Sequence, residues 1–494
     1  MSEVVQFNYS LLVPEYVLAV TAGVVLLADA FRAELKLGRG TVPWMVVAGA
    51  VLTVLASIVT AGRTGEFAGL FAVDAFTTFF RVLLAATLAV VVVGSHEFVT
   101  KHIRHQGEFY TMLVFATLGG TVMAASRELL TAYIGVELLS FSLYVAVSLA
   151  KRDPRSGEAG LKYVLLGGVA SATLLYGMSL IYGAAGSTSY GLIAEHLAKD
   201  SEGVHMALVL GLAMVIAGLG FKASAVPFHM WTPDAYEGAP LPVTAILSAT
   251  SKAAAFALIL RLFAGPLLPV LRDWQWMIAV ISLLTMVFGN LIALQQTNIK
   301  RLLAYSSIGQ VGFMLMAVVT MSDVSASALL LHLGGYLVTN LAVFMAVIAL
   351  YNQTGSEEIS DMRGLAESNP YLALVIAAGL FSLSGMPLLA GFTTKFILFQ
   401  AAASGGYLWL VSIAVIMSTV SLYYYLQVVR QMYVLQADGS LIDPQSPDVN
   451  GPRWRLTATG YVVTAGLLAG VVFVGLYVSP LAVAANRAAA ALFS

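Results

Sequence analysis

The sequence predicts an all-α polytopic membrane protein with about fourteen transmembrane helices. Of its 494 residues, 59% are hydrophobic and only 10% are charged, whereas a soluble domain has roughly 25% charged residues. The mean hydropathy is +0.87. Apolar windows long enough to cross a hydrocarbon core of about 30 Å as helices recur at residues 9–31, 42–62, 76–95, 109–126, 129–150, 159–183, 204–236, 241–264, 275–296, 301–320, 325–351, 370–401, 405–435 and 455–479.

The composition also excludes several functions. Zero cysteines exclude disulfides, cysteine-ligated zinc and cysteine-ligated iron–sulfur clusters. The net charge of -1 gives no indication of nucleic-acid binding. The sequence contains no phosphate-binding glycine loop of the Walker or dinucleotide type. We therefore expect no redox cofactor, nucleotide or metal on this chain.

The distribution of basic residues predicts the orientation of the chain in the membrane. Loops that follow odd-numbered spans hold fifteen Lys and Arg residues, whereas the loops on the other side hold six. By the positive-inside rule both termini lie outside the cytoplasm. Four basic residues remain inside spans, and we expect one of these, Arg81, to reach the membrane interface with its long side chain.

Two spans contain helix-breaking residues. Pro227, Pro233, Pro240 and Pro242 follow Lys222 in and after the seventh span. Gly385, Pro387 and Gly391 interrupt the twelfth span, which contains Lys395. Broken membrane helices tend to mark a transport path. Because the breaks lie five spans apart, spans 4–8 and 9–13 are predicted to form two inverted five-helix repeats.

This repeat predicts four segments of the chain. They are an N-terminal three-helix segment at 1–100, the first repeat at 101–265, the second repeat at 270–435, and a cytoplasmic loop with the last span at 436–494.

Buried ionisable residues are the candidates for function. Glu137 is the only charged residue between positions 129 and 149, and an intramembrane charge usually faces a partner or a water-filled path. Burial disfavours the charged form of an acid or an amine and pairing favours it, so Glu137 and Lys222 are predicted to pair. Lys252 and Lys395 have hydroxyl neighbours that can hold water, and we interpret the four residues as a proton relay.

Three further residues are weaker candidates, each with a structural alternative. His332 is either a relay residue or a satisfied structural histidine. His229 lies at the helix break, and this position favours an interfacial structural role over a role in the relay. Lys162 is either an extension of the relay or a topology anchor beside the basic cluster that begins at Lys151.

Two long motifs resemble a known family. Residues 295–316, QQTNIKRLLAYSSIGQVGFMLM, are similar to the signature of the antiporter-like membrane subunits of respiratory complex I and the multisubunit cation/proton antiporters. Residues 221–258, FKASAVPFHMWTPDAYEGAPLPVTAILSATSKAAAFAL, resemble the broken seventh helix and the eighth helix of that family. Residues 384–433 look most like its subunit N branch.

The resemblance implies roles for individual residues. Glu137 corresponds to the fifth-helix acid, Lys222 to the seventh-helix lysine, Lys252 to the eighth-helix lysine and Lys395 to the twelfth-helix lysine. His332 falls in the eleventh-helix region.

The resemblance also implies a setting. The expected function is proton translocation in the bacterial inner (plasma) membrane, within a complex whose partner subunits hold NADH, FMN, iron–sulfur clusters and quinone. Other complex I membrane subunits, M-like and K-like, are the expected neighbours, together with the lipid bilayer. The alternatives are a subunit of a cation/proton antiporter or membrane-bound hydrogenase, and a non-conducting structural subunit.

Overall fold

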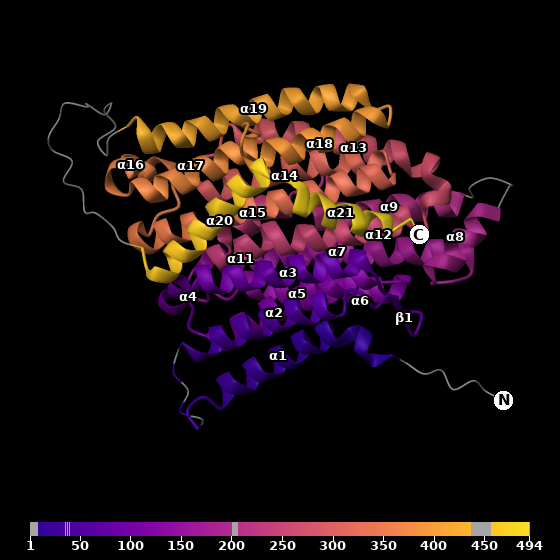
Figure 1. The fold of residues 1–494 in the computed structure, drawn as a ribbon, viewed down its shortest axis with the longest axis horizontal. Coiled ribbons are helices and arrows are strands. Elements are labelled where there is room, and N and C mark those ends of the chain that lie inside the picture. Colours follow the sequence, from indigo (N-terminus) through magenta and orange to yellow (C-terminus); the bar gives the residue numbers. More distant parts are fainter. Residues whose placement is uncertain are drawn as a thin grey trace.

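The computed structural model describes residues 8–34, 36, 38, 40–199, 206–435 and 456–493. These residues are helical except for connections and one hairpin, in which strand β1 (Gly65–Phe67) pairs antiparallel with β2 (Phe71–Val73). The long helices lie roughly parallel (Figure 1). A helix satisfies its own backbone hydrogen bonds, as a hydrocarbon environment requires of a spanning segment. The prediction of an all-α polytopic membrane protein is confirmed.

Thirteen helical segments in the described part of the chain are long and apolar enough to cross a membrane. They are η1 (Tyr9–Leu12) with α1 (Val13–Ala30), α2 (Thr41–Val59), α3 (Ala75–Gly94), α5 (Gln106–Ala125), α6 (Leu129–Val147), α7 (Pro154–Ala185), α9 (Met206–Ala223), the continuous segment α11 (Leu241–Ile246), η2 (Leu247–Ser251) and α12 (Lys252–Ala264), η3 (Leu268–Val270) with α13 (Leu271–Ala293), α14 (Ile299–Val319), α15 (Asp323–Thr354), α19 (Leu408–Tyr433) and α20 (Ala458–Leu476).

The predicted twelfth span consists of two shorter helices. α17 (Pro370–Ser384) ends where Gly385 adopts a left-handed conformation with φ of 94°, and α18 (Ala390–Ser404) begins five residues later. Each has 15 residues, about 22 Å at ~1.5 Å per residue, which is short of a hydrocarbon core of about 30 Å. A crossing at this point therefore needs both helices.

The predicted seventh span is also shorter than its apolar window. α9 ends at Ala223, and a separate helix, α10 (Trp231–Gly238), precedes the start of α11. The other short elements are α4 (His96–His102), α8 (Tyr190–Lys199), η4 (Ile359–Met362), α16 (Leu365–Ser368) and α21 (Ser479–Ala490). The inverted relation of the two repeats stays a prediction, and residues 436–455 of the last predicted segment lie outside the described residues.

From α1 to α19 the helices follow the chain order across the molecule, whereas α20 and α21 return to its middle, where they contact α15 and α3 (Figure 1). In Figure 1, α1 and α2 lie along one edge, α19 lies along the opposite edge, and α14 and α15 lie between them. α4 and α16 lie at one end of the bundle, whereas α8 and β1 lie at the other. Every residue from Leu241 to Ala264 is buried, and so is every residue of α14 except Arg301. Polar atoms on these two central segments therefore need partners inside the protein.

The expectation that Arg81 reaches the membrane interface is wrong. Its side chain is fully buried and makes a bidentate ion pair with Glu15 of α1, with Nε to Oε1 and Nη2 to Oε2 both 2.7 Å. Nη2 also donates to the Leu11 carbonyl at 3.1 Å. A neighbouring helix offers a carboxylate, so Arg81 has no need to extend to the headgroups. The pair joins α1 to α3.

We expect Arg81→Leu to destabilise the chain, because it leaves the Glu15 carboxylate buried without a partner, at a cost of about 3–5 kcal/mol. The melting temperature of the purified chain in detergent is the measurement. The double variant Arg81→Leu, Glu15→Leu removes both charges and is expected to recover most of the loss. If the single variant melts like the wild type, the pair does not hold these helices together.

Candidate functional site

Glu137, Lys222, Lys252 and Lys395, which we call the ionisable set, lie on four separate helices. Glu137 is in the middle of α6, Lys222 is in the last turn of α9, Lys252 begins α12, and Lys395 is in α18. Glu137 is half-buried. The three lysines are exposed by only 3%, 1% and 4% in that order. These lysines are removed from lipid and from bulk solvent, so their neighbours decide what they can do.

Glu137 and Lys222 contact different hydroxyl groups. The Ser171 hydroxyl on α7 donates to Glu137 Oε1 and lies 2.9 Å from the Tyr133 hydroxyl. Lys222 Nζ donates to Ser140 Oγ at 2.7 Å. Ser140 follows Glu137 by one helical turn of α6. No ion pair within 4.0 Å joins Glu137 to Lys222 among the described residues, so the predicted pair is open here and the Lys222 ammonium bonds to Ser140 instead.

Lys252 follows a local change in helix geometry. η2 is a single π-helical turn between α11 and α12, and such turns are frequent at functional sites. Lys252 Nζ has no hydrogen-bond partner in the described protein and lies 5.9 Å from the centre of the Tyr236 ring. A buried ammonium is costly without hydrogen bonds. Among the described residues the cation–π contact is the one polar interaction of this ammonium, so we expect water to supply its hydrogen bonds.

Lys395 uses a backbone carbonyl that the helix break leaves free. Its Nζ donates to the Leu383 carbonyl at 2.6 Å, at the end of α17. The same carbonyl accepts from Gln310 Nε2 of α14 at 3.0 Å. Nζ also lies 5.1 Å from the centre of the Phe313 ring. The interruption between α17 and α18 therefore supplies the acceptor that keeps a buried lysine in place.

One face of α15 joins the surroundings of Lys252 to those of Lys395. His332, Tyr336 and Asn340 are four residues apart, a spacing that places them on one face of a helix. His332 Nδ1 lies 3.0 Å from Thr394 Oγ1, next to Lys395. Tyr336 donates to the Ser248 carbonyl at 3.3 Å, and Asn340 Nδ2 donates to Ser248 Oγ at 2.6 Å, one turn before Lys252. The polar face of α15 thus spans the two lysine sites.

The other two weaker candidates lie outside this polar interior. Lys162 is 47% exposed and forms ion pairs with Glu158 at 2.8 Å and Asp234 at 3.1 Å, which favours the topology anchor over the relay. His229 is half-buried in the connection between α9 and α10, and its Nδ1 has no protein partner.

Several buried polar residues were not predicted from the sequence, because only charged residues within spans were taken as candidates. Gln310 and Asn340 are uncharged, although each is a polar residue in an apolar helix, which was the available signal. Arg261 and Lys300 were counted with the loops because they lie near span ends. Arg261 is buried against Asp74, with Nη1 to Oδ2 at 2.7 Å, and Lys300 against Glu357, with Nζ to Oε1 at 2.6 Å.

Buried polar atoms without a protein partner occur on several helices, among them the segment that carries Lys252 and the helices α14 and α15 that contact it. A buried polar atom normally bonds to protein or to ordered water, and leaving it unsatisfied costs about 1–3 kcal/mol. Such atoms include Tyr163 Oη, Tyr236 Oη, Thr250 Oγ1, Ser251 Oγ, Lys252 Nζ, Ser307 Oγ, Gln310 Oε1 and His332 Nε2. Their number indicates that water completes the hydrogen bonding in this part of the interior.

The fold and this site define a class: a polytopic membrane protein whose interior carries lysines and unpartnered polar groups from several helices. Comparison with known proteins gives the family. The sequence profile described as NADH:quinone oxidoreductase/Mrp antiporter, transmembrane, matches residues 126–421. The chain belongs to this family.

Individual relatives agree with that assignment. A Heliobacterium modesticaldum protein named NADH-quinone oxidoreductase subunit N is 40% identical over 488 residues, which are 98% of this chain and 100% of the relative. The protein of the same name from Moorella thermoacetica is 42% identical over 396 residues, 80% of this chain and 83% of the relative. A chain in the structure of respiratory complex I from Thermus thermophilus with bound Aureothin is 31% identical, with a TM-score of 0.76 over 96% of this chain and 100% of that chain. The resemblance inferred from the motifs, including the subunit N branch, is confirmed.

We expect a high-resolution map of the chain in its membrane assembly to show ordered water bonded to Lys252 Nζ, and further waters at Gln310 Oε1 and His332 Nε2. The reason is that these buried atoms have no other partner. The buried Arg261 serves as the internal control, because its Nε, Nη1 and Nη2 all have protein partners. A dry interior around Lys252 would contradict the interpretation of these atoms as water sites.

Proposed function

We propose that this chain is a proton-translocating membrane-arm subunit of NADH–quinone oxidoreductase, respiratory complex I. Protons move through the ionisable set while quinone is reduced elsewhere in the complex. The observation that carries the proposal is that Lys222, Lys252 and Lys395, each at least 96% buried, have no carboxylate partner among the described residues. A lysine held only by neutral groups gains or loses a proton without leaving an unpaired carboxylate behind.

The relay begins at Glu137 and Lys222. While the Lys222 ammonium donates to Ser140, it is not paired with Glu137; a rotation that brings the two together favours the charged form of both. Opening the pair removes that support and drives the proton onward to Lys252 and Lys395. Waters at the unpartnered hydroxyls and the polar face of α15 provide the intervening hydrogen bonds.

The energy of one buried ion pair is comparable with the cost of moving a proton against the membrane potential. Moving one charge against ~150 mV costs about 3.5 kcal/mol, at roughly 2.3 kcal/mol per 100 mV. Two unit charges about 4 Å apart interact by about 4 kcal/mol at an effective dielectric constant of 20. Forming and breaking one buried ion pair is therefore of the magnitude required.

The redox chemistry belongs to partner subunits. NADH, FMN, the iron–sulfur clusters and quinone are held there, and this chain, which has no cysteine, carries no redox centre. It acts as part of a translocase through coupling to that chemistry.

Neighbouring membrane subunits, M-like and K-like, complete the environment of Glu137. The outer face of α6 beside Glu137 exposes Ile134 by 55% and Phe141 by 59%. An apolar groove of about 420 Å³ on this face has Glu137 among its lining residues. A carboxylate facing lipid at mid-span is costly, so a protein neighbour at this face supports both the acid and the assembly.

The chain lies in the bacterial plasma membrane with both termini outside the cytoplasm. The excess of Lys and Arg in loops that follow odd-numbered spans supports this orientation. The relatives named subunit N favour this function over a cation/proton antiporter or a membrane-bound hydrogenase. A non-conducting structural subunit is disfavoured by the unpaired lysines, since a scaffold gains nothing from them.

Two substitutions of Lys395 test the relay. Lys395→Arg keeps a permanent positive charge but does not release a proton at working pH, and Lys395→Met keeps much of the aliphatic stem without charge. We expect both to lower proton pumping severely in proteoliposomes of the assembled complex, because Lys395 must gain and lose a proton. Assembly, followed by native electrophoresis, is the control. Normal pumping by the Arg variant together with failure of the Met variant would reduce Lys395 to a fixed charge.

We expect Glu137→Gln to lower pumping strongly and, through coupling, quinone-linked turnover, because the amide keeps the contact with Ser171 but cannot pair with Lys222 as an anion. Proton uptake and NADH oxidation are measured on the same preparation. Glu358→Gln, at an acid outside the spanning helices, is the matched control. Unchanged pumping by the Glu137 variant in assembled complex would remove this residue from the relay.

A further inference from the structure

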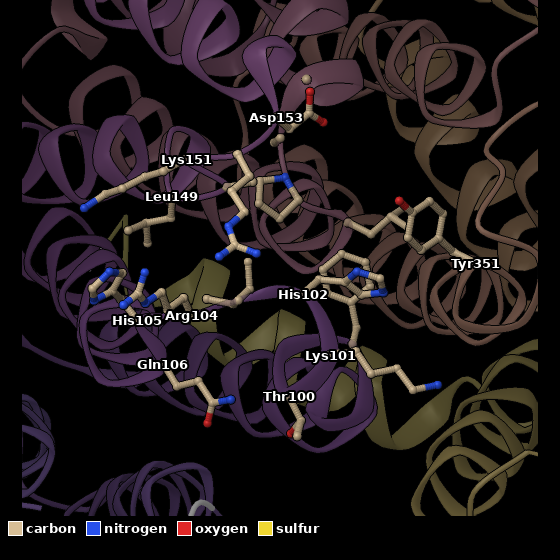
Figure 2. Close-up of a pocket in the computed structure, with 18 of the residues that line it drawn as sticks. Thr100, Lys101, His102, Arg104, His105, Gln106, Leu149, Lys151, Asp153 and Tyr351 are labelled. Atoms are coloured by element: carbon tan, nitrogen blue, oxygen red, sulfur yellow. The ribbon is translucent and has the colours of Figure 1, made fainter.

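A basic cavity of about 740 Å³ lies at the end of the bundle where α4 is found (Figure 1). The cationic side chains that line it are Arg32, Lys101, Arg104, Lys151, Arg152 and Lys300. They come from the connection after α1, from α4 and the connection after it, from the loop between α6 and α7, and from α14. In Figure 2, Lys151 and Arg104 lie on one side of this cavity and Lys101 on another, and the two lysine side chains extend outward from its centre. Segments far apart in sequence thus bring like charges together.

The two carboxylates of the cavity do not neutralise this charge. Glu357 is held by Lys300, with Oε1 2.6 Å from Nζ, and Lys300 also donates to the Ala239 carbonyl at 3.0 Å. Asp153 caps α7, where its Oδ1 accepts from the Arg155 backbone N–H at 2.9 Å. Six cations face two carboxylates, which leaves a net charge of +4 before the histidines are counted.

Three of the cations have no acidic partner. Arg104, Lys151 and Arg152 form no ion pair with any described residue and are exposed, whereas Lys101 is paired with Glu97 at 2.8 Å. The imidazole of His102 adds little charge, because burial and the nearby Lys101 ammonium lower its pKa below the ordinary value. The unpaired cations are therefore the groups available to an anion.

The positive-inside rule accounts for basic residues in these loops but not for their convergence on one cavity. A concave site lined by one sign of charge concentrates counter-ions, and its size falls within the range of about 300–1,000 Å³ typical of small-molecule sites. Arginine binds phosphate oxygens through two parallel hydrogen bonds, and lysine binds them as a point charge. Basic pockets at the cytoplasmic ends of membrane helices bind phosphorylated lipid headgroups.

We propose that the basic cavity binds a phosphate group, carried by the headgroup of an anionic phospholipid or by a soluble phosphate. Arg104, Lys151 and Arg152 are the principal ligands. The Lys300–Glu357 pair closes the floor and keeps the anion at the rim. Binding holds together the loops after α4 and α6. This site is separate from the ionisable set and does not depend on the function proposed for it.

Two triple variants of the assembled complex test the site. The cavity variant is Arg104→Gln, Lys151→Gln, Arg152→Gln. The control, Arg155→Gln, Arg363→Gln, Arg430→Gln, removes three charges that do not line the cavity. Native mass spectrometry of complex in phosphatidylcholine nanodiscs containing phosphatidylglycerol counts the retained anionic lipid, and binding of labelled inorganic phosphate is measured in nanodiscs of phosphatidylcholine alone. We expect the cavity variant to bind about a hundredfold more weakly and the control to bind like the wild type.

The two arms identify the source of the phosphate. Retention of phosphatidylglycerol that excess inorganic phosphate does not displace identifies a lipid headgroup, whereas saturable binding of labelled phosphate without anionic lipid identifies a soluble anion. The charge-retaining variant Arg104→Lys, Lys151→Arg, Arg152→Lys keeps most of the binding if the site is electrostatic. Equal losses in both triple variants, or undiminished binding in the cavity variant, would overturn the proposal.

Discussion

The absence of water in a hydrocarbon core is the constraint on which this structure depends. Every backbone polar atom placed at that depth needs a partner inside the protein, and two different arrangements of the chain use these atoms. Continuous helices satisfy their own backbone, while interrupted helices leave carbonyls that side chains use. The Leu383 carbonyl illustrates the second arrangement, since it accepts from both Lys395 and Gln310. The interruption after α17 therefore provides a polar position that an unbroken helix cannot offer.

The sequence was sufficient to predict the class of fold and the candidate residues. Hydropathy located the spans because the bilayer imposes a minimum length on each of them, and glycine and proline near Lys395 and Lys222 indicated where helices end. The lysines were found because a charge in an apolar window is easily seen. Partner choice was not predictable in the same way. Glu15 and Arg81 are 66 residues apart, and only the packing of α1 and of α3 against α2 and α5 brings them together.

The contacts of uncharged polar residues were the second feature that the sequence did not predict. Ser140 lies within a turn of Glu137. Nothing in the local sequence indicated that Ser140, and not the acid, accepts the hydrogen bond from Lys222 in this conformation. Gln310 and Asn340 have ordinary side chains whose significance comes from their complete burial and their contacts with Leu383 and Ser248. A π-helical turn before Lys252 is likewise a property of packing that residue types do not reveal.

The buried cations of the described chain fall into two groups, and the difference between them separates structure from proposed function. Arg81, Arg261 and Lys300 each have a carboxylate oxygen within 2.7 Å. These pairs are neutral as units, and a proton lost from one partner would leave the other as an isolated charge. The lysines of the ionisable set face a hydroxyl, a carbonyl or an aromatic ring instead. Because no fixed anion holds their protons, their charge can change as the surrounding hydrogen bonds and water change, which is the property that a proton relay needs and that a structural ion pair lacks.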